Sequence, residues 1–229
     1  MPAGRQGASD RAYDYVKTRV MTGAFPGGEL ISEGEVATAL GMSRTPVRES
    51  FIRLEAEGFL RLYPQRGALV VPVSPAEMRS VMEARLVCER FAVEKVIRLG
   101  GAARAGVADK LGDHLDQQRA MSDAGRMEEF FQSDRIFHTE LLEAADNTFL
   151  GGLYASLRDR QVRMVHESAA RDPRRVATIL IEHARIADAV RDGDTAAALE
   201  AVRVHLMGTV SALGMGMEPA SALAIDPAT

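Results

Sequence analysis

The sequence predicts a mainly α-helical protein, built from an N-terminal winged helix-turn-helix and a C-terminal, all-helical antiparallel bundle of six or seven helices. Residues 10–73 combine short helical patterns with one strand-turn-strand pattern. In residues 75–213 the apolar residues recur only with the helical period. Aromatic residues make up 5% of the chain and Trp is absent, a composition that favours helix packing over a large sheet.

The first two predicted helices have recognisable ends. Asp10 is expected to cap the first helix and Gly23 to end it. After a connecting loop, Ser32 and Glu35 have the spacing of a capping box, in which each side chain bonds the backbone N–H of the other residue. Gly41 suits the left-handed position that closes the second helix.

A third helix and a hairpin complete this first domain. The helix is expected to begin at Ser43 or Thr45 and has Pro46 in its first turn, where a missing N–H costs nothing. The segment LRLYPQRGALVV alternates on both sides of a Pro-Gln-Arg-Gly turn, which predicts a β-hairpin. Helix, helix, turn, helix and hairpin in this order outline a winged helix-turn-helix over residues 10–73.

A second domain is expected over residues 75–213. The segment VPVSPAEM marks the boundary, because two prolines precede a Ser-Pro helix start. Breaks in the helical pattern occur at Gly100-Gly101, Ser122–Gly125, Asp146-Asn147, Asp172-Pro173 and Asp192-Gly193. Residues 1–9 and 214–229 lack periodicity, so both ends are expected to be flexible.

Composition limits the class of protein. Hydrophobic residues make up 46% and charged residues 26% of the chain, which is enough for a packed core. The single Cys88 excludes an internal disulfide and a Cys-rich zinc motif. No apolar signal region or long apolar run occurs, so we expect a cytoplasmic protein without membrane contact. Because the net charge is −4, any affinity for nucleic acid has to be local.

The third helix begins with a basic cluster. Arg44, Thr45 and Arg48 share one arc at the helix end that contacts base edges when such a helix enters the major groove. Arginine pairs with guanine or phosphate through two hydrogen bonds, and the hydroxyls of Ser43 and Thr45 can hold phosphates.

The two arginines alone would fit a solvated charged face, since acidic residues share the helix. The capped helix before them and the hairpin after them favour DNA binding instead. Gln65 and Arg66 at the hairpin tip could then reach a neighbouring groove.

The segment ISEGEVATALGMSRTPVRESFIRLEAEGFLRLYPQRGALV resembles the DNA-binding domain of GntR-type bacterial transcription regulators, most specifically in its SRTPVRE core. The resemblance implies that Arg44, Thr45 and Arg48 contact DNA, and that Gly67 lets the wing backbone approach the minor groove. One departure is that Gly34 replaces an arginine that contacts DNA in some members. We therefore expect a different affinity or operator sequence.

Four polar side chains of the second domain fall on predicted apolar helix faces. They are Asp134, His138, His183 and His205. A hydrogen-bonded core histidine would explain any one of them, whereas a shared divalent metal explains all four at once. The ligand types favour Zn²⁺, with Ni²⁺, Mn²⁺ and Fe²⁺ as alternatives. The other histidines, His114 and His166, lie in polar stretches and are expected at the surface.

The order of these residues resembles the all-helical effector-binding domain, called FCD, of the FadR subgroup of the GntR family. The matching features are the D-x3-H spacing, the segment EHARIADAVRDGD and a final HL pair. The resemblance implies that the four side chains bind a divalent cation and that a small carboxylate completes its coordination. Arg85, in the matching segment MEARLVCERFAVEKVI, is a candidate to bind an effector carboxylate. A surface or dimer-interface position would explain Arg85 equally well.

Together these features predict a homodimeric transcription regulator, most often a repressor in this family, that binds pseudo-palindromic operator DNA. A small organic-acid effector is expected to bind at the metal and to change operator affinity. One alternative is a metal-dependent hydrolase or lyase of small carboxylates, in which the metal activates a water. The other is a sensor in which the metal ion is the signal. The enzyme alternative lacks an obvious free carboxylate as general base.

Overall fold

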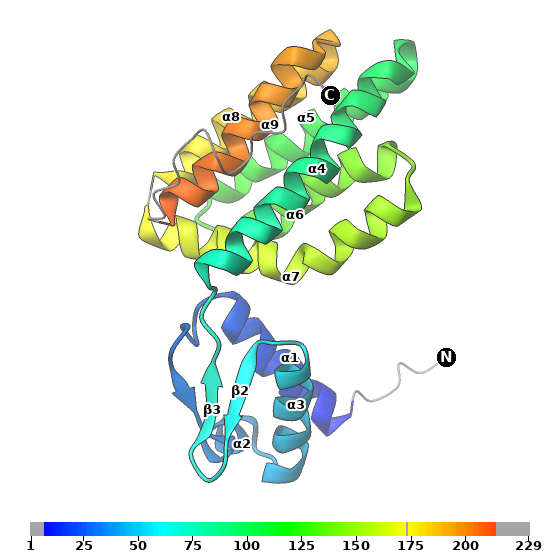
Figure 1. Cartoon of the computed structure of the whole chain (residues 1–229). Helices are drawn as coiled ribbons and strands as arrows, with labels where there is room; N and C mark the ends of the chain where they lie inside the picture. The colour runs from blue at the N-terminus through cyan, green and yellow to red at the C-terminus, as the bar shows by residue number, and fades with distance from the viewer. Residues whose placement is uncertain (1–6, 173, 214–229) are drawn as a thin grey trace, which may run out of the picture. The chain divides into compact units, whose positions relative to one another are not determined.

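The computed structural model describes residues 7–172 and 174–213. Of the ends predicted to be flexible, residues 1–6 and 214–229 lie outside these ranges. The prediction is wrong for residues 8 and 9, which belong to the first helix. The chain divides into two compact units, Met1–Ser74 and Pro75–Thr229, which Figure 1 shows in blue to cyan and in green to red. Within the described ranges, no helix combines the length and apolarity needed to cross a lipid bilayer.

The first unit contains the helices α1 (Ala8–Met21), α2 (Glu33–Leu40) and α3 (Arg44–Ala56). The prediction that Asp10 caps the first helix is wrong, because α1 already begins at Ala8 with Gly7 at the N-cap position. Asp10 lies in the first turn instead, where its negative charge suits the positive end of the helix dipole.

The predicted ends of α2 are confirmed. The capping box is complete, with the Ser32 hydroxyl accepting from the Glu35 N–H at 3.0 Å and the Glu35 carboxylate accepting from the Ser32 N–H at 3.1 Å. Gly41 ends the helix in the left-handed conformation. These contacts fix where the turn between α2 and α3 begins.

The hairpin is present as β2 (Leu60–Tyr63) and β3 (Gly67–Val70). A third strand, β1 (Leu30–Ile31), pairs antiparallel with β3 and gives the sheet order β1-β3-β2. The prediction of a plain loop before α2 is therefore wrong at its last residue, Leu30. Two residues are too few to show alternation in a sequence, and their pairing depends on the free edge of β3.

The core of the first unit forms between α1 and one face of α3. Val16 and Val20 of α1 and Val47, Phe51 and Leu54 of α3 are almost completely buried. The helical period places the three α3 residues on one face, which leaves the opposite face of α3 free for solvent.

The second unit is a bundle of six helices, as predicted, and no strand occurs in its described residues. The helices are α4 (Pro75–Leu99), α5 (Gly101–Asp123), α6 (Met127–Ala144), α7 (Thr148–Arg171), α8 (Arg175–Asp192) and α9 (Thr195–Ala212). The helices break at the five predicted places. The first of them, α4, contacts each of the other five helices, and in Figure 1 it runs through the middle of the bundle.

Candidate functional site

The start of α3 presents four of the predicted DNA-contacting residues together. Ser43, at the N-cap, and Arg44, Thr45 and Arg48 are all exposed. The Ser43 side chain makes no capping hydrogen bond, so its hydroxyl and the free N–H groups of the first turn remain available to phosphate oxygens. This end of the helix can therefore offer both side-chain and backbone donors to DNA.

Not every arginine of α3 is available in this way. Arg53 forms ion pairs with Asp10 at 3.3 Å and Glu57 at 3.7 Å, and its guanidinium lies 3.8 Å from the centre of the Tyr13 ring. Arg53 therefore attaches α3 to α1, and the basic surface of the helix is confined to its N-terminal end.

Gly34, the departure from the family pattern, gives Arg44 space at the start of α2. A Cβ at residue 34 would lie 3.2 Å from Nη2 of Arg44, which is closer than an ordinary van der Waals contact. The guanidinium of Arg44 therefore lies over the space that a side chain at residue 34 would need.

The wing carries the remaining predicted contacts at its tip. Gln65 and Arg66 are exposed between β2 and β3, and Gln65 has a positive φ of 62°. Gly67 has a φ of 99°, and a Cβ at this position would collide with the carbonyl oxygen of Ile31. Gly67 is therefore required by the pairing of β1 with β3, a reason that the sequence did not reveal.

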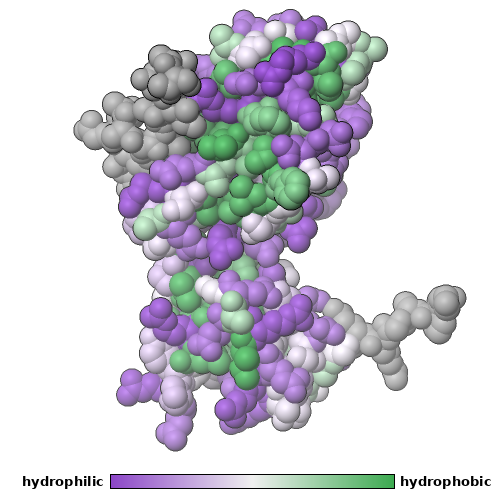
Figure 2. Space-filling model, turned by 45° about the vertical axis from the view of Figure 1, so that its right-hand side comes forward, coloured by the Kyte–Doolittle hydropathy of each residue, from purple (hydrophilic) through white to green (hydrophobic). Residues whose placement is uncertain are grey.

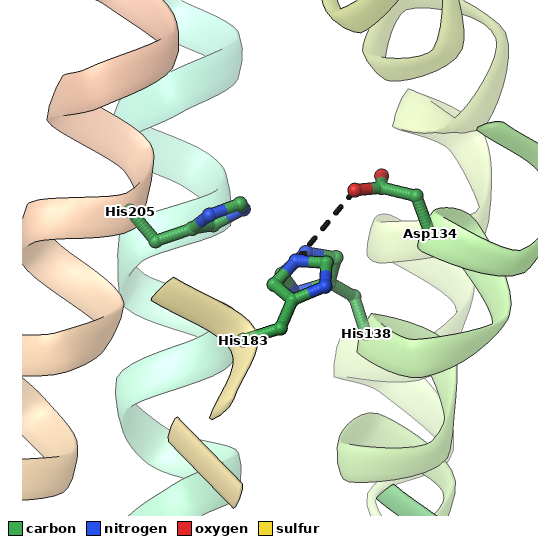
Figure 3. A group of neighbouring side chains, drawn as sticks. All are labelled: Asp134, His138, His183 and His205. Atoms are coloured by element: carbon green, nitrogen blue, oxygen red, sulfur yellow. Dashed lines mark hydrogen bonds and ion pairs between the residues drawn. The ribbon is translucent and has the colours of Figure 1, made fainter. Parts of the chain in front are cut away.

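The helical unit brings the four predicted metal-ligating side chains to one point. One ligand atom from each of Asp134, His138, His183 and His205 lies within 4.8 Å of the others. All four residues, which we call the four-residue cluster, are buried, with exposed fractions of 5%, 1%, 0% and 1%. Figure 3 shows Asp134 and His138 extending from α6, His183 from α8 and His205 from α9 toward a common centre.

Each imidazole of the four-residue cluster has an oxygen atom behind it. Nδ1 of His183 lies 2.8 Å from Oε1 of Gln118, and Nδ1 of His205 lies 2.9 Å from Oε2 of Glu182. Nδ1 of His138 lies 3.0 Å from Oε2 of Glu89, at an angle outside ideal hydrogen-bond geometry. An acceptor at Nδ1 places the proton there and leaves the Nε2 lone pair for the centre.

Burial keeps this centre in a state that can bind a cation. Desolvation lowers the pKa values of His183 and His205 well below their ordinary value, and neighbouring histidines act in the same direction. Both rings are therefore neutral, the form that binds metals. Burial also raises the pKa of Asp134, against the opposing effect of His138 and Arg85. A cation at the centre would favour the Asp134 carboxylate.

A second observation also indicates that these residues suit a divalent metal. Nε2 of His183 lies 3.2 Å from Nε2 of His138, so two lone pairs face each other, and Oδ1 of Asp134 has no hydrogen-bond partner although it is buried. Groups of this kind are costly to bury unless a positive charge lies between them. Imidazole nitrogen and carboxylate oxygen are ligands of Zn²⁺ and of neighbouring first-row metals.

Arg85 lies in the interior, so its alternative explanation as a surface or dimer-interface residue is wrong. It is 1% exposed, and its Nε donates to Oε1 of Glu89 at 2.8 Å. The Tyr154 hydroxyl donates to the same oxygen at 2.9 Å. Burial alone would raise the pKa of Glu89, but Arg85 and His138 outweigh it and hold this pKa below its ordinary value.

The sequence reasoning missed the residues behind the histidines. Glu89 had a detectable signal, because it continues the buried stripe of Met82, Leu86 and Val93 on α4. Glu182 and Gln118 had none, since a polar residue beside a histidine or on a polar helix is unremarkable. Buried Arg175 was missed as well, and its Nη1 lies 2.9 Å from Oε2 of Glu182.

Two further histidines are more enclosed than predicted. The side chain of His166 is 12% exposed, and its ring centre lies 3.9 Å from that of Phe131. The side chain of His114 is 18% exposed beside Glu140. Both residues are therefore partly buried instead of fully at the surface, because side chains of α6 lie beside them.

The first unit is a winged helix-turn-helix, and the second is a helical domain with a buried cluster of three histidines and an aspartate. This combination defines a ligand-responsive DNA-binding regulator. Comparison with known proteins agrees. Residues 8–70 match the model for bacterial regulatory proteins of the gntR family, and residues 80–208 match the FCD domain. The chain belongs to the GntR family of transcription regulators, with the domain architecture of the FadR subgroup. Since the members of this family are regulators, the hydrolase or lyase alternative is set aside.

The chain is also similar to individual regulators. An uncharacterized HTH-type transcriptional regulator in an unstable DNA locus of Streptomyces ambofaciens is 33% identical over 214 residues, which are 89% of this chain and 85% of the relative. The gluconate operon transcriptional repressor of Bacillus subtilis is 25% identical over 147 residues, 64% of this chain and 58% of the relative. The structure of a GntR regulator from Rhodococcus sp. RHA1 has a similar fold, with a TM-score of 0.71 at 22% identity, and the match covers 91% of this chain and 99% of that one.

Proposed function

We propose that this regulator binds a divalent metal in the four-residue cluster and a small organic acid at that metal, and that the acid changes its affinity for operator DNA. The observation that carries the proposal is the arrangement of the three imidazoles, each with an oxygen near Nδ1 and with Nε2 left for the centre. Such outer contacts orient metal-binding histidines and raise their basicity. Zn²⁺ is the metal that the ligand set favours most.

The charges around the cluster favour an anionic effector. Glu89 is paired with Arg85 at 2.8 Å and Glu182 with Arg175 at 2.9 Å, so these four charges cancel in pairs. Asp134 contributes the one remaining negative charge. A divalent cation would leave the buried site with a net positive charge, which a carboxylate would neutralise. Arg85, whose Nε is engaged by Glu89, would offer its outer nitrogens to that carboxylate.

At the DNA end, Arg44, Thr45 and Arg48 would contact the major groove, Ser43 would bind a phosphate, and the wing residues Gln65, Arg66 and Gly67 would approach the neighbouring groove. We expect the protein to repress transcription, since one relative is a gluconate operon transcriptional repressor. The effector changes DNA affinity only if it binds two arrangements of the protein with different affinities, typically by about 1–3 kcal/mol.

A homodimer would place two recognition helices, one α3 from each subunit, on a pseudo-palindromic operator. Figure 2 shows apolar side chains gathered on one face of the helical unit. The exposed large apolar residues of this unit include Phe149, with an exposed fraction of 89%, and Leu153, with 46%. An exposed apolar surface of this kind is typical of a protein interface, and the dimer would cover it.

The test combines metal analysis with effector screening. Elemental analysis of purified protein should find about one divalent metal ion per chain, and the His183→Ala variant should lose it. A thermal-shift screen of small organic acids should then find acids that stabilise the metal-loaded wild type but not the variant. Full metal occupancy in His183→Ala would remove this residue from the site.

Operator binding decides between a metal cofactor and a metal sensor. An operator selected from random duplexes by the wild-type protein is titrated at several metal concentrations, with and without the stabilising acid. If the metal alone changes the affinity fully and the acid adds nothing, the ion is the signal. If only the acid changes the affinity of metal-loaded protein, the metal is a cofactor for the effector.

A further inference from the structure

A cavity of about 500 Å³ opens between α6 and α7, and its lining includes no member of the four-residue cluster. Its lining changes from partly apolar in the middle to basic at one end along the two helices. Leu142, Gly151 and Ala155 form a partly apolar middle section in which two of the three residues are small. A Cβ at Gly151 would meet nothing within 4 Å. The missing side chain at this position therefore contributes to the space.

The end of the cavity far from the α6–α7 turn is basic. Arg135 lies nine residues before the end of α6, and Arg158 lies ten residues after the start of α7, so the two arginines line the cavity at a similar level. Arg158 has Asp159 beside it at 3.8 Å. The acidic residue Glu143 lies two helical turns from Arg135, roughly 12 Å along α6, and so does not neutralise this end.

The accessible donors at this end are the two guanidinium groups. Gln161 also lines the cavity, but it is only 5% exposed, so it forms part of the wall. Guanidinium groups suit a carboxylate, and the middle section would take a short apolar chain.

The cavity is connected to the four-residue cluster through the side chains of Tyr154 and Glu89. Tyr154 lines the cavity, and its hydroxyl donates to Oε1 of Glu89 at 2.9 Å. The other oxygen of Glu89 lies 3.0 Å from Nδ1 of His138. A ligand that displaces the Tyr154 ring would move this carboxylate, which orients one of the imidazoles.

We propose that the α6–α7 cavity is a second ligand site, that it takes a monocarboxylate with a short aliphatic chain, and that Tyr154 and Glu89 couple it to the metal centre. The binding site stands on the cavity itself, whereas the coupling rests on the proposed metal function. Ligand in the cavity changes metal affinity, and by linkage the metal changes the affinity of the cavity by the same factor.

The binding test uses acetate, butyrate and hexanoate in calorimetric titrations of the full zinc-loaded chain. Two sites per chain are expected for butyrate or hexanoate in the wild type. Gly151→Leu fills the cavity and should leave one site, while Gly152→Leu, on the next residue of α7 and also without neighbours within 4 Å, should keep two. If the metal-centred effector site does not exist, the wild type shows one site and Gly151→Leu none. An unchanged number of sites in Gly151→Leu, or no saturable binding of any acid to the wild type, overturns the proposal.

The coupling test uses Tyr154→Phe, which keeps the ring in the cavity and removes only the bond to Glu89. Zinc affinity is measured by chelator competition with and without saturating hexanoate. The wild type should change its zinc affinity at least threefold on adding hexanoate, and Tyr154→Phe should change little while still binding the acid. Equal responses of the two proteins overturn the coupling.

Discussion

The imidazole of His183 is fixed by the amide of Gln118, with Nδ1 and Oε1 2.8 Å apart inside the helical bundle. This contact crosses from α5 to α8 and turns Nε2 of His183 toward Nε2 of His138, 3.2 Å away. The other two histidines have carboxylates in the same place, so Gln118 is the one neutral acceptor of the set. It orients the ring without adding charge to the buried site.

Replacing Gln118 by Leu should weaken zinc binding by about 10–100-fold, because outer contacts of metal-binding histidines are worth that much. Chelator competition measures the affinity. Gln117→Leu, on the exposed neighbouring position of the same helix, is the matched control and should leave the affinity unchanged. Equal affinities of the two variants would contradict a role for Gln118 in orienting His183.

Replacing Arg48 by Ala should weaken operator binding by about 1–3 kcal/mol if its guanidinium reads a base pair. A phosphate contact would instead lower the salt dependence of binding, by about one unit of the log–log slope. Fluorescence anisotropy at several salt concentrations separates the two outcomes. Arg98→Ala, an exposed arginine at the end of α4, removes the same charge and should change neither quantity.

Replacing Gly67 by Ala should destabilise the winged unit more than the same change at Gly58. Both glycines have positive φ values, 99° and 82°, so both variants carry the conformational penalty of roughly 1–2 kcal/mol. Only at Gly67 does the new Cβ meet a backbone oxygen, that of Ile31. Urea unfolding measures the difference. Equal losses of stability in the two variants would mean that β1 can move away from residue 67 without a further loss of free energy.

Replacing Gly208 by Ala should disturb the support of His205. The new Cβ would lie 2.7 Å from both Nη1 of Arg175 and Oε1 of Glu182, the pair behind this histidine. We expect a loss of about 1–3 kcal/mol in stability and weaker zinc binding. Gly106→Ala, at an open helical position of α5, should instead be neutral or stabilise by up to about 1 kcal/mol. A stable, fully metal-binding Gly208→Ala protein would contradict the tight packing.

His166 should contribute to the acid sensitivity of the fold. Burial lowers its pKa below the ordinary 6.5, although Glu128 acts in the opposite direction. In the window below pH 6.5 and above the lowered pKa, the unfolded chain binds more protons than the folded one, so stability falls as the pH falls. His166→Asn cannot take up this proton. The stability of the wild type relative to this variant should therefore decrease from pH 7.5 to pH 5.5 in thermal unfolding, and a constant difference would contradict the assignment.

Local patterns predicted most of the fold. The capping box at Ser32 and Glu35, the left-handed Gly41 and the five breaks between the helices of the bundle all depend on residues close together in the chain. The strand β1 was missed because its two residues pair only through contact with β3, a partner distant in sequence. The N-cap of α1 was predicted at Asp10, three residues after its actual position at Gly7, because helix ends are the part of a helix that local patterns fix least well.

The four-residue cluster was also predictable from patterns within single helices. Asp134, His138, His183 and His205 interrupt apolar helix faces, and a helix that turns polar groups inward has to satisfy them. The period of each helix showed which residues point inward. It could not show which oxygen lies behind each imidazole, because those oxygens belong to α4, α5 and α8.

The sequence by itself determined the two domains' types of structure, the reading helix and the inward direction of the four polar side chains, since each of these follows from residues within a few turns. Only the tertiary structure decided that Gln118, Glu89 and Glu182 lie near Nδ1 of the histidines, that Arg85 is buried, and that Gly67 accommodates Ile31. All of these features depend on contacts between separate helices and strands. They are set by how the side chains of the whole core pack together, and no local pattern records them.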